Sequence, residues 1–140
     1  MKNIVSRLKV LKLLLAVMPI FSTAQSVLLD GMENTQGWEL ILADGVEASL
    51  MVEKGAVGSA LRFDYNFTKG TGYGGMQKFI SLELPEHFEI SFLLKADSPS
   101  NNFEIKFIDQ SGHNVWWVNN RNYDFPREWQ RIRIKRRHVE

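Results

Sequence analysis

The sequence predicts an all-β domain, an antiparallel β-sandwich. Roughly eight short extended runs follow one another along the chain, separated by Gly, Asn, Asp and Pro. Outside the N-terminal leader, no window shows the spacing of an amphipathic helix. Strands that follow one another without helices between them favour antiparallel sheets packed face to face.

Residues 1–24 are predicted to be a secretory signal peptide. Four cations between Lys2 and Lys12 precede an apolar run over residues 13–21, and small residues end the leader at Ala24. The apolar run is shorter than the roughly 20 residues of a membrane-spanning helix, so no membrane span is expected. Cleavage after Ala24 leaves a domain over residues 25–140 in a secreted, periplasmic or cell-surface location.

The charge of the expected domain is negative. The whole chain has a formal net charge of +1, but without the leader 13 basic side chains stand against 16 acidic ones, a net of −3. Five of the cations lie within residues 131–137, and residues 25–130 carry 8 basic and 15 acidic side chains. No nucleic-acid partner is therefore expected. The absence of cysteine excludes disulfides and thiolate metal sites.

The first half of the domain contains several predicted strands. An apolar run at residues 27–29 comes first, and residues 37–42, 46–53 and 61–67 follow as extended segments. Aromatic residues alternate with polar ones over residues 61–67, so one face of that strand is expected to be covered.

A glycine-rich loop, residues 69–75, follows these strands. It lacks the Lys-Ser/Thr ending of a phosphate-binding loop, and the segment after it, residues 76–84, has the pattern of a strand. We therefore expect a mobile loop that carries one aromatic side chain, Tyr73. Another alternating strand is predicted over residues 88–94.

The central feature of the sequence is a predicted hairpin over residues 101–123. Adjacent residues of a strand point to opposite faces, so Trp116 and Trp117 cannot both enter one core, and one is expected at the surface. If the loop covers residues 109–112, Ile105 lies opposite Trp116 and Trp117 points outward. If the loop also takes in His113, Ile105 lies opposite Trp117 and Trp116 points outward, and the pattern leaves both registers open.

An outward indole in this hairpin has polar neighbours suited to a sugar ring. An apolar plate buries one face of a pyranose, while amide and guanidinium groups bond its hydroxyls. The alternative is that the second tryptophan packs under a long loop or against another module. The candidate carbohydrate-binding residues are Trp116, Trp117, Tyr73, Asn119, Asn120, Arg121 and Lys106.

The last predicted strand covers residues 129–137, and no turn follows it. A sandwich that stops there lacks closing strands, so we expect the sandwich to be truncated at its C-terminal end. Arg131, Arg133 and Lys135 share one face of this strand, and we expect that face to pair with the acidic body of the domain.

No motif in the sequence predicts catalysis. The three histidines lie far apart, and the chain has neither a cysteine nucleophile nor a GxSxG elbow. The one cofactor that the sequence suggests is a structural calcium ion. Asp30, Glu33 and Asp64 are hard oxygen donors near predicted strand ends, which suits Ca²⁺.

Several segments resemble one family of exported bacterial modules. They are the opening at residues 30–33 with Trp38 after it, LRFDYNF, the glycine-rich loop, and NNFEIKFIDQSGHNVWW followed by FPREWQRIRIKRR. Together they are similar to the N-terminal galactose-binding-like, or discoidin (coagulation factor 5/8 type), modules of secreted glycan-degrading proteins. The resemblance implies a jelly-roll carbohydrate-binding module, with a catalytic or further binding domain C-terminal to it in the same polypeptide.

The sequence thus predicts non-catalytic binding of a poly- or oligosaccharide. One alternative is an accessory sandwich that packs against a catalytic domain without binding sugar. Another is a small lyase or hydrolase whose acidic residues the sequence does not pair.

Overall fold

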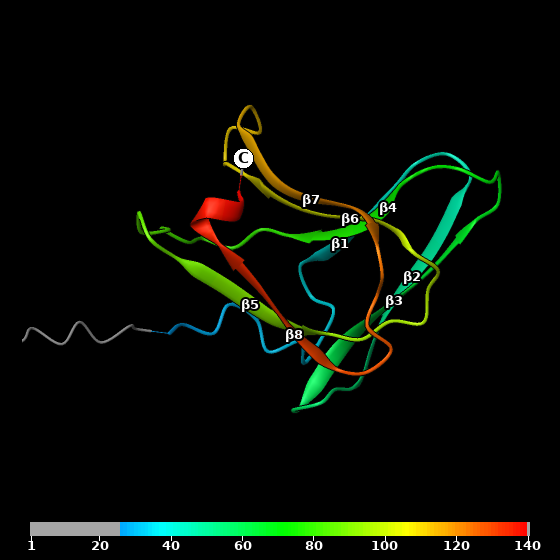
Figure 1. Ribbon diagram of the computed structural model, residues 1–140, viewed down its shortest axis with the longest axis horizontal. Helices are drawn as coiled ribbons and strands as arrows, with labels where there is room; N and C mark the ends of the chain where they lie inside the picture. The colour runs from blue at the N-terminus through cyan, green and yellow to red at the C-terminus, as the bar shows by residue number, and fades with distance from the viewer. Residues whose placement is uncertain (1–25, 140) are drawn as a thin grey trace, which may run out of the picture.

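The structure is a computed structural model that describes residues 26–139. These residues form eight β-strands and one 3-10 helix (Figure 1). No α-helix occurs among them, so the prediction of an all-β chain is confirmed. The elements are β1 (Trp38–Leu42), β2 (Val46–Lys54), β3 (Ser59–Phe67), β4 (Gly74–Lys78), β5 (Glu89–Leu94), β6 (Asn101–Ile108), β7 (Val115–Tyr123), β8 (Gln130–Lys135) and η1 (Arg136–His138).

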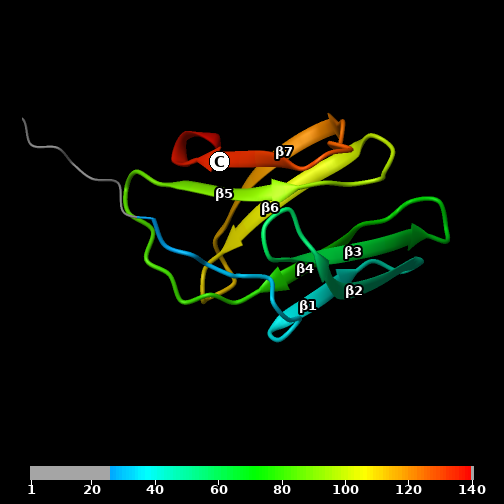
Figure 2. The ribbon, with the colours of Figure 1, turned by 90° about the horizontal axis from the view of Figure 1, so that it is seen from below.

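The strands pair in two nested units. β1 pairs with β4 around the hairpin β2–β3, and β5 pairs with β8 around the hairpin β6–β7. Every pair is antiparallel, and within the described part of the chain each sheet has two strands. Figure 2 shows β1 to β4 on one side of the molecule and β5 to β7 on the other. The arrangement is consistent with a β-sandwich.

Most of the predicted strands form close to where the sequence pattern places them, but the strand expected over residues 76–84 is too long. β4 ends at Lys78, which lies opposite Trp38, the first residue of its partner β1. Gly37, with φ of 78°, and the hydrogen bond from the Trp38 amide to the Thr35 carbonyl (3.1 Å) turn the chain before β1 begins. Residues 79–84 therefore have no strand beside them in the described chain. The apolar run at residues 27–29 is irregular as well.

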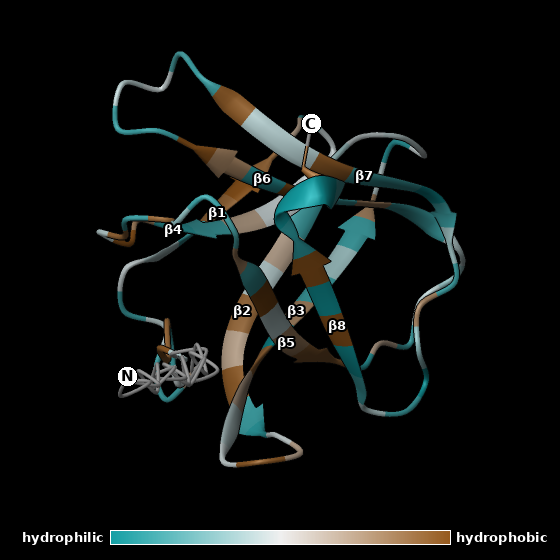
Figure 3. Ribbon diagram, turned by 60° about the vertical axis from the view of Figure 1, so that its left-hand side comes forward, coloured by the Kyte–Doolittle hydropathy of each residue, from teal (hydrophilic) through white to brown (hydrophobic). Residues whose placement is uncertain are grey.

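The interior of the described chain is small. Its buried hydrophobic residues are Val46, 8% exposed, and Ile134, 3% exposed. Along β8, apolar and charged residues alternate visibly (Figure 3), so one face of the strand points inward. The aromatic face of β3 is only half covered, contrary to expectation, because Tyr65 is exposed between the half-buried Phe63 and Phe67.

The glycine-rich loop packs against Val46. A Cβ atom on Gly72, whose φ is 152°, would lie 2.7 Å from Val46 Cγ2, and one on Gly74 would lie 3.2 Å from Val46 Cγ1. The Ala43 amide also donates to the Tyr73 carbonyl at 2.9 Å. The glycines therefore let the backbone approach the most buried residue of the first unit, a packing role that the sequence pattern did not reveal.

Three aromatic rings close one end of the β6–β7 hairpin. Phe103, Tyr123 and Phe125 have centroid separations between 5.1 and 5.5 Å. They lie beside an irregularity in the ladder between Asn101 and Phe103, and Asn122 has a positive φ of 51° there. This cluster fixes the base of the hairpin that carries the two adjacent tryptophans.

The predicted signal peptide, residues 1–24, lies outside the described residues. Across residues 26–139, no helix has the length and apolar character needed to cross a membrane.

Candidate functional site

The loop of the β6–β7 hairpin is longer than either predicted register requires. Ile108 is the last paired residue of β6 and lies opposite Val115, so the loop covers residues 109–114. Ile105 therefore lies opposite Val118, and both predicted registers are wrong.

Asp109 explains the length of this loop. Its carboxylate accepts hydrogen bonds from Asn114 Nδ2 at 2.6 Å and from Ser111 Oγ at 2.7 Å, and its amide donates to the Asn114 carbonyl at 3.2 Å. The bonds from Asn114 and then Ser111 stabilise the charged form, so the pKa of Asp109 is lowered. The Asp109 side chain, at the start of the loop, thus holds Asn114 at its end. The pattern of apolar residues does not reveal this contact.

The register places the two indoles on opposite faces of the hairpin. Trp117 lies opposite Lys106, whereas Trp116 lies opposite Phe107. One surface indole was expected, and the structure exposes both, since Trp116 is 42% exposed and Trp117 is 40% exposed. Chemical surroundings rather than burial distinguish them.

We call the exposed polar surface around Trp117 the Trp117 face. It is formed by Glu104 and Lys106 of β6 and by Trp117 and Asn119 of β7, and Arg121 follows on the same side by strand alternation. Lys106 Nζ lies 5.2 Å from the centroid of the Trp117 ring and 3.1 Å from Glu104 Oε2. An aromatic plate, a cation, a carboxylate and an amide are thus presented together on one rigid ladder.

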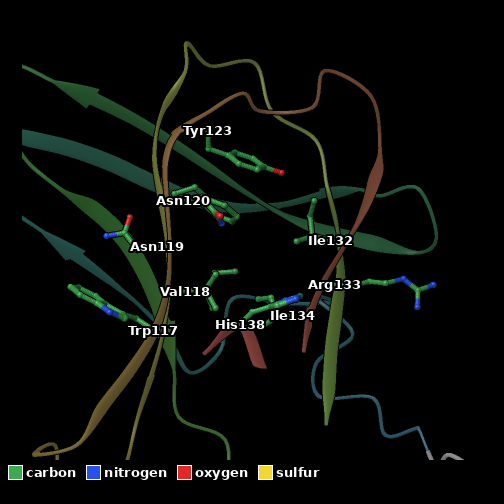
Figure 4. A pocket seen from close by; sticks show the side chains of 11 residues that line it. Trp117, Val118, Asn119, Asn120, Tyr123, Ile132, Arg133, Ile134 and His138 are labelled. Carbon is green, nitrogen blue, oxygen red and sulfur yellow. The ribbon is translucent and has the colours of Figure 1, made fainter. Parts of the chain in front are cut away.

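A cavity of about 420 Å³ lies beside β7, and its lining includes Trp117 and Asn119 as well as Val118 and Asn120. In Figure 4 the side chains of Val118, Asn120 and Tyr123 point to one side of the strand, and those of Trp117 and Asn119 point to the other. Ile105, Ile132, Ile134 and His138 also line the cavity. Asn120 is therefore separated from the Trp117 face, although the sequence pattern grouped the two.

Tyr73 is also apart from the Trp117 face. It lies in the loop before β4, in the first nested unit, and its side chain is exposed. The structure therefore brings together Trp117, Lys106, Asn119 and Arg121 among the predicted sugar-binding residues, and it places Trp116, Asn120 and Tyr73 elsewhere.

Each of the three carboxylates predicted to bind calcium has a protein partner of its own. Asp30 Oδ2 accepts from Lys78 Nζ at 2.6 Å, Glu33 from Ser59 Oγ at 2.7 Å, and Asp64 from Arg62 Nε at 2.9 Å. Among residues 26–139, no three His, Asp or Glu side chains gather in a group able to hold a metal ion. Calcium binding stays a prediction, and it requires the ion to compete with these partners.

The Asp30 contacts form a cluster that the sequence pattern missed. Besides Lys78, the carboxylate accepts from the Met32 amide at 2.7 Å and from Trp38 Nε1 at 3.3 Å, and Lys78 Nζ lies 5.9 Å from the Trp38 ring centroid. The hydrogen bond from Lys78, followed by that from Met32, lowers the pKa of Asp30. This cluster attaches the segment before β1 to the β1–β4 ladder.

The basic face of β8 pairs with the acidic body only in part, through a single described carboxylate. Arg133 Nη1 lies 2.8 Å from Glu89 Oε1 and Lys135 Nζ 3.8 Å from Glu89 Oε2, while Arg131 donates to the Ser91 hydroxyl. Within the described part of the chain, Glu89 is the one carboxylate that forms ion pairs with this strand. The face therefore keeps most of its positive charge.

Comparison of the chain with protein-family models, with curated proteins and with solved structures found no match. The resemblance to galactose-binding-like modules thus depends on the sequence segments alone.

Proposed function

We propose that this protein binds carbohydrate without catalysis and that the Trp117 face is its binding surface. The observation that carries the proposal is the position of Trp117, which is 40% exposed on the same hairpin face as Lys106, Glu104 and Asn119. An indole buries the apolar face of a pyranose, and the surrounding side chains offer donors and acceptors to its hydroxyls.

A sugar that binds the Trp117 ring must compete with Lys106. Its ammonium group lies 5.2 Å from the centroid of Trp117, and an exposed contact of this kind contributes about 0.5–1 kcal/mol. Burial of an apolar sugar face against an indole can offset this loss. Since Lys106 also contacts Glu104 at 3.1 Å, its amine stays near the Trp117 ring and can donate to a sugar hydroxyl after it moves aside.

The polar groups of the Trp117 face should make the site specific for certain sugars. A ligand that leaves one of them desolvated and unpaired loses roughly 1–3 kcal/mol, so the site should discriminate between epimers at one hydroxyl. The rival proposal, an accessory sandwich that packs on a catalytic domain, requires no such discrimination.

The test is a glycan array followed by calorimetry with the glycans that bind. Trp117→Ala should abolish binding, and Trp116→Ala, which changes an equally exposed indole on the other face, should retain it. Because the two side chains have nearly equal exposure, we expect both variants to fold and to lose similar stability. Equal binding by both variants would favour the accessory sandwich, and turnover of any glycan would favour an enzyme.

The proposal has a wider context that the family resemblance implies. It includes a jelly-roll topology, export of the domain, and a catalytic or further binding domain in the same polypeptide. A glycan that binds the Trp117 face would then hold the attached domain near its substrate.

A further inference from the structure

One segment has the pattern of a strand but no strand beside it. In residues 79–84, Ile80, Leu82 and Leu84 alternate with Ser81 and Glu83. All three apolar side chains are more than 40% exposed, and Phe79 before them is 75% exposed. We call residues 79–86 the unpaired segment. Its apolar side chains are therefore only partly covered by the described part of the same chain.

The cavity beside β7 has an apolar wall and lies between strands that each have a free edge in the described chain. Val118, Ile132 and Ile134 give it an apolar wall, and its volume of about 420 Å³ is large compared with ordinary packing gaps between sheets. Among the described strands, β7 pairs with β6 alone and β8 with β5 alone, so each presents one free edge of backbone donors and acceptors. A free edge of this kind accepts another strand.

The charges of the two regions are complementary. The unpaired segment carries Glu83 and Glu86, which are exposed and take part in none of the ion pairs found within residues 26–139. Arg133, which also contacts Glu89, lines the cavity, and Arg121 is exposed on β7. An acidic strand is therefore attracted to this region.

We propose that the unpaired segment of one copy of this protein adds to the free edge of β7 in a second copy. Ile80, Leu82 and Leu84 then enter the cavity beside Val118, and Glu83 lies on the other face of the added strand, next to Arg121. A strand fits better than a small molecule because it satisfies the backbone edge and places apolar side chains at every second position. Two reciprocal additions form a closed dimer.

The first test measures association of the full chain by sedimentation equilibrium. We expect a concentration-dependent dimer. Leu82→Glu should raise its dissociation constant by at least about tenfold, because a buried leucine contributes more than the free energy of a tenfold change. Ser81→Glu is the matched control, since it adds the same charge on the outward face and should weaken the dimer less. A monomer at all concentrations, or equal effects of the two variants, would overturn the proposal.

The second test uses the absence of cysteine in the chain. A mixture of Glu83→Cys chains with Arg121→Cys chains should form a disulfide-linked heterodimer under mild oxidation, whereas a mixture of Glu83→Cys with Lys54→Cys should not. A labelled peptide of residues 78–86 should bind the protein, and a peptide of scrambled order should not. Equal cross-linking in both mixtures, or equal binding of both peptides, would show non-specific association and refute the strand addition. These measurements need no glycan, so their outcome is independent of the proposed sugar site.

Discussion

Removal of the Asp30 carboxylate should destabilise the protein far more than removal of an exposed one. Asp30 and Lys78 meet at 2.6 Å, and their side chains are 11% and 26% exposed. Asp44 and Lys69 meet at the same 2.6 Å, but their side chains are 90% and 63% exposed. The two pairs thus have equal separation and differ in burial, which makes Asp44→Ala a matched control for Asp30→Ala.

The expected magnitude follows from the bonds that each change removes. Asp30→Ala removes hydrogen bonds from the Lys78 ammonium, the Met32 amide and the Trp38 indole. A bond to a charged group contributes about 1.5–3 kcal/mol and a neutral one about 1 kcal/mol, and Lys78 regains some hydration through its exposed part. We expect a loss of roughly 3 kcal/mol for Asp30→Ala. The loss for Asp44→Ala should be below about 0.5 kcal/mol because its ion pair is solvated.

Thermal and urea unfolding of the three proteins measures this difference. A loss of roughly 3 kcal/mol corresponds to a decrease in Tm of at least about 10 °C for a domain of this size. Because its pKa is lowered in the folded state, the ionised Asp30 contributes stability that is fully present above the ordinary carboxyl pKa of 3.8. That contribution is lost as the pH falls through the lowered pKa. The difference in the free energy of unfolding between the wild type and Asp30→Ala should therefore shrink in acid. Equal losses for the two alanine variants at neutral pH would refute the reasoning.

Two further predictions concern the ion and the glycine-rich loop. If the three predicted carboxylates hold calcium, Ca²⁺ at a hundred times its dissociation constant should stabilise the fold by about 2.7 kcal/mol, and a melting temperature indifferent to both Ca²⁺ and EDTA would exclude the site. Gly72→Ala should cost about 1–3 kcal/mol in urea unfolding, because its Cβ would lie 2.7 Å from Val46 Cγ2. Gly75→Ala, whose Cβ meets no atom within 4 Å, should be nearly neutral, and equal effects would show that the contact with Val46 is unimportant.

Much of the strand content could be predicted because alternation is a local property. β2, β3 and β5 lie within a few residues of their predicted positions, and the alternation of apolar and polar side chains is clearest in β3. The same reasoning placed Trp116 and Trp117 on opposite faces of one strand, as the register confirms. These conclusions require no knowledge of the neighbouring strand.

The extent and position of the candidate site could not be predicted in the same way. The loop of the β6–β7 hairpin is set by hydrogen bonds from Asn114 and Ser111 to Asp109, and its length decides that Lys106 rather than Ile105 lies beside Trp117. A shift of one residue would reverse every side chain of the strand. The sequence pattern therefore assigned Asn119 and Asn120 to one candidate site because both are polar, although they face opposite sides of the hairpin.

By itself, the sequence determined that this chain forms short antiparallel strands and presents two adjacent indoles on opposite faces of one of them. Tertiary structure alone decided the nested pairing of β1 with β4 and β5 with β8, the end of β4 at Lys78, and the contact of Asp30 with Lys78. The physical reason is that alternation depends on the backbone geometry of neighbouring residues. Pairing and burial depend on which distant segments come together, and the chain contains several segments of similar pattern that could compete for each edge.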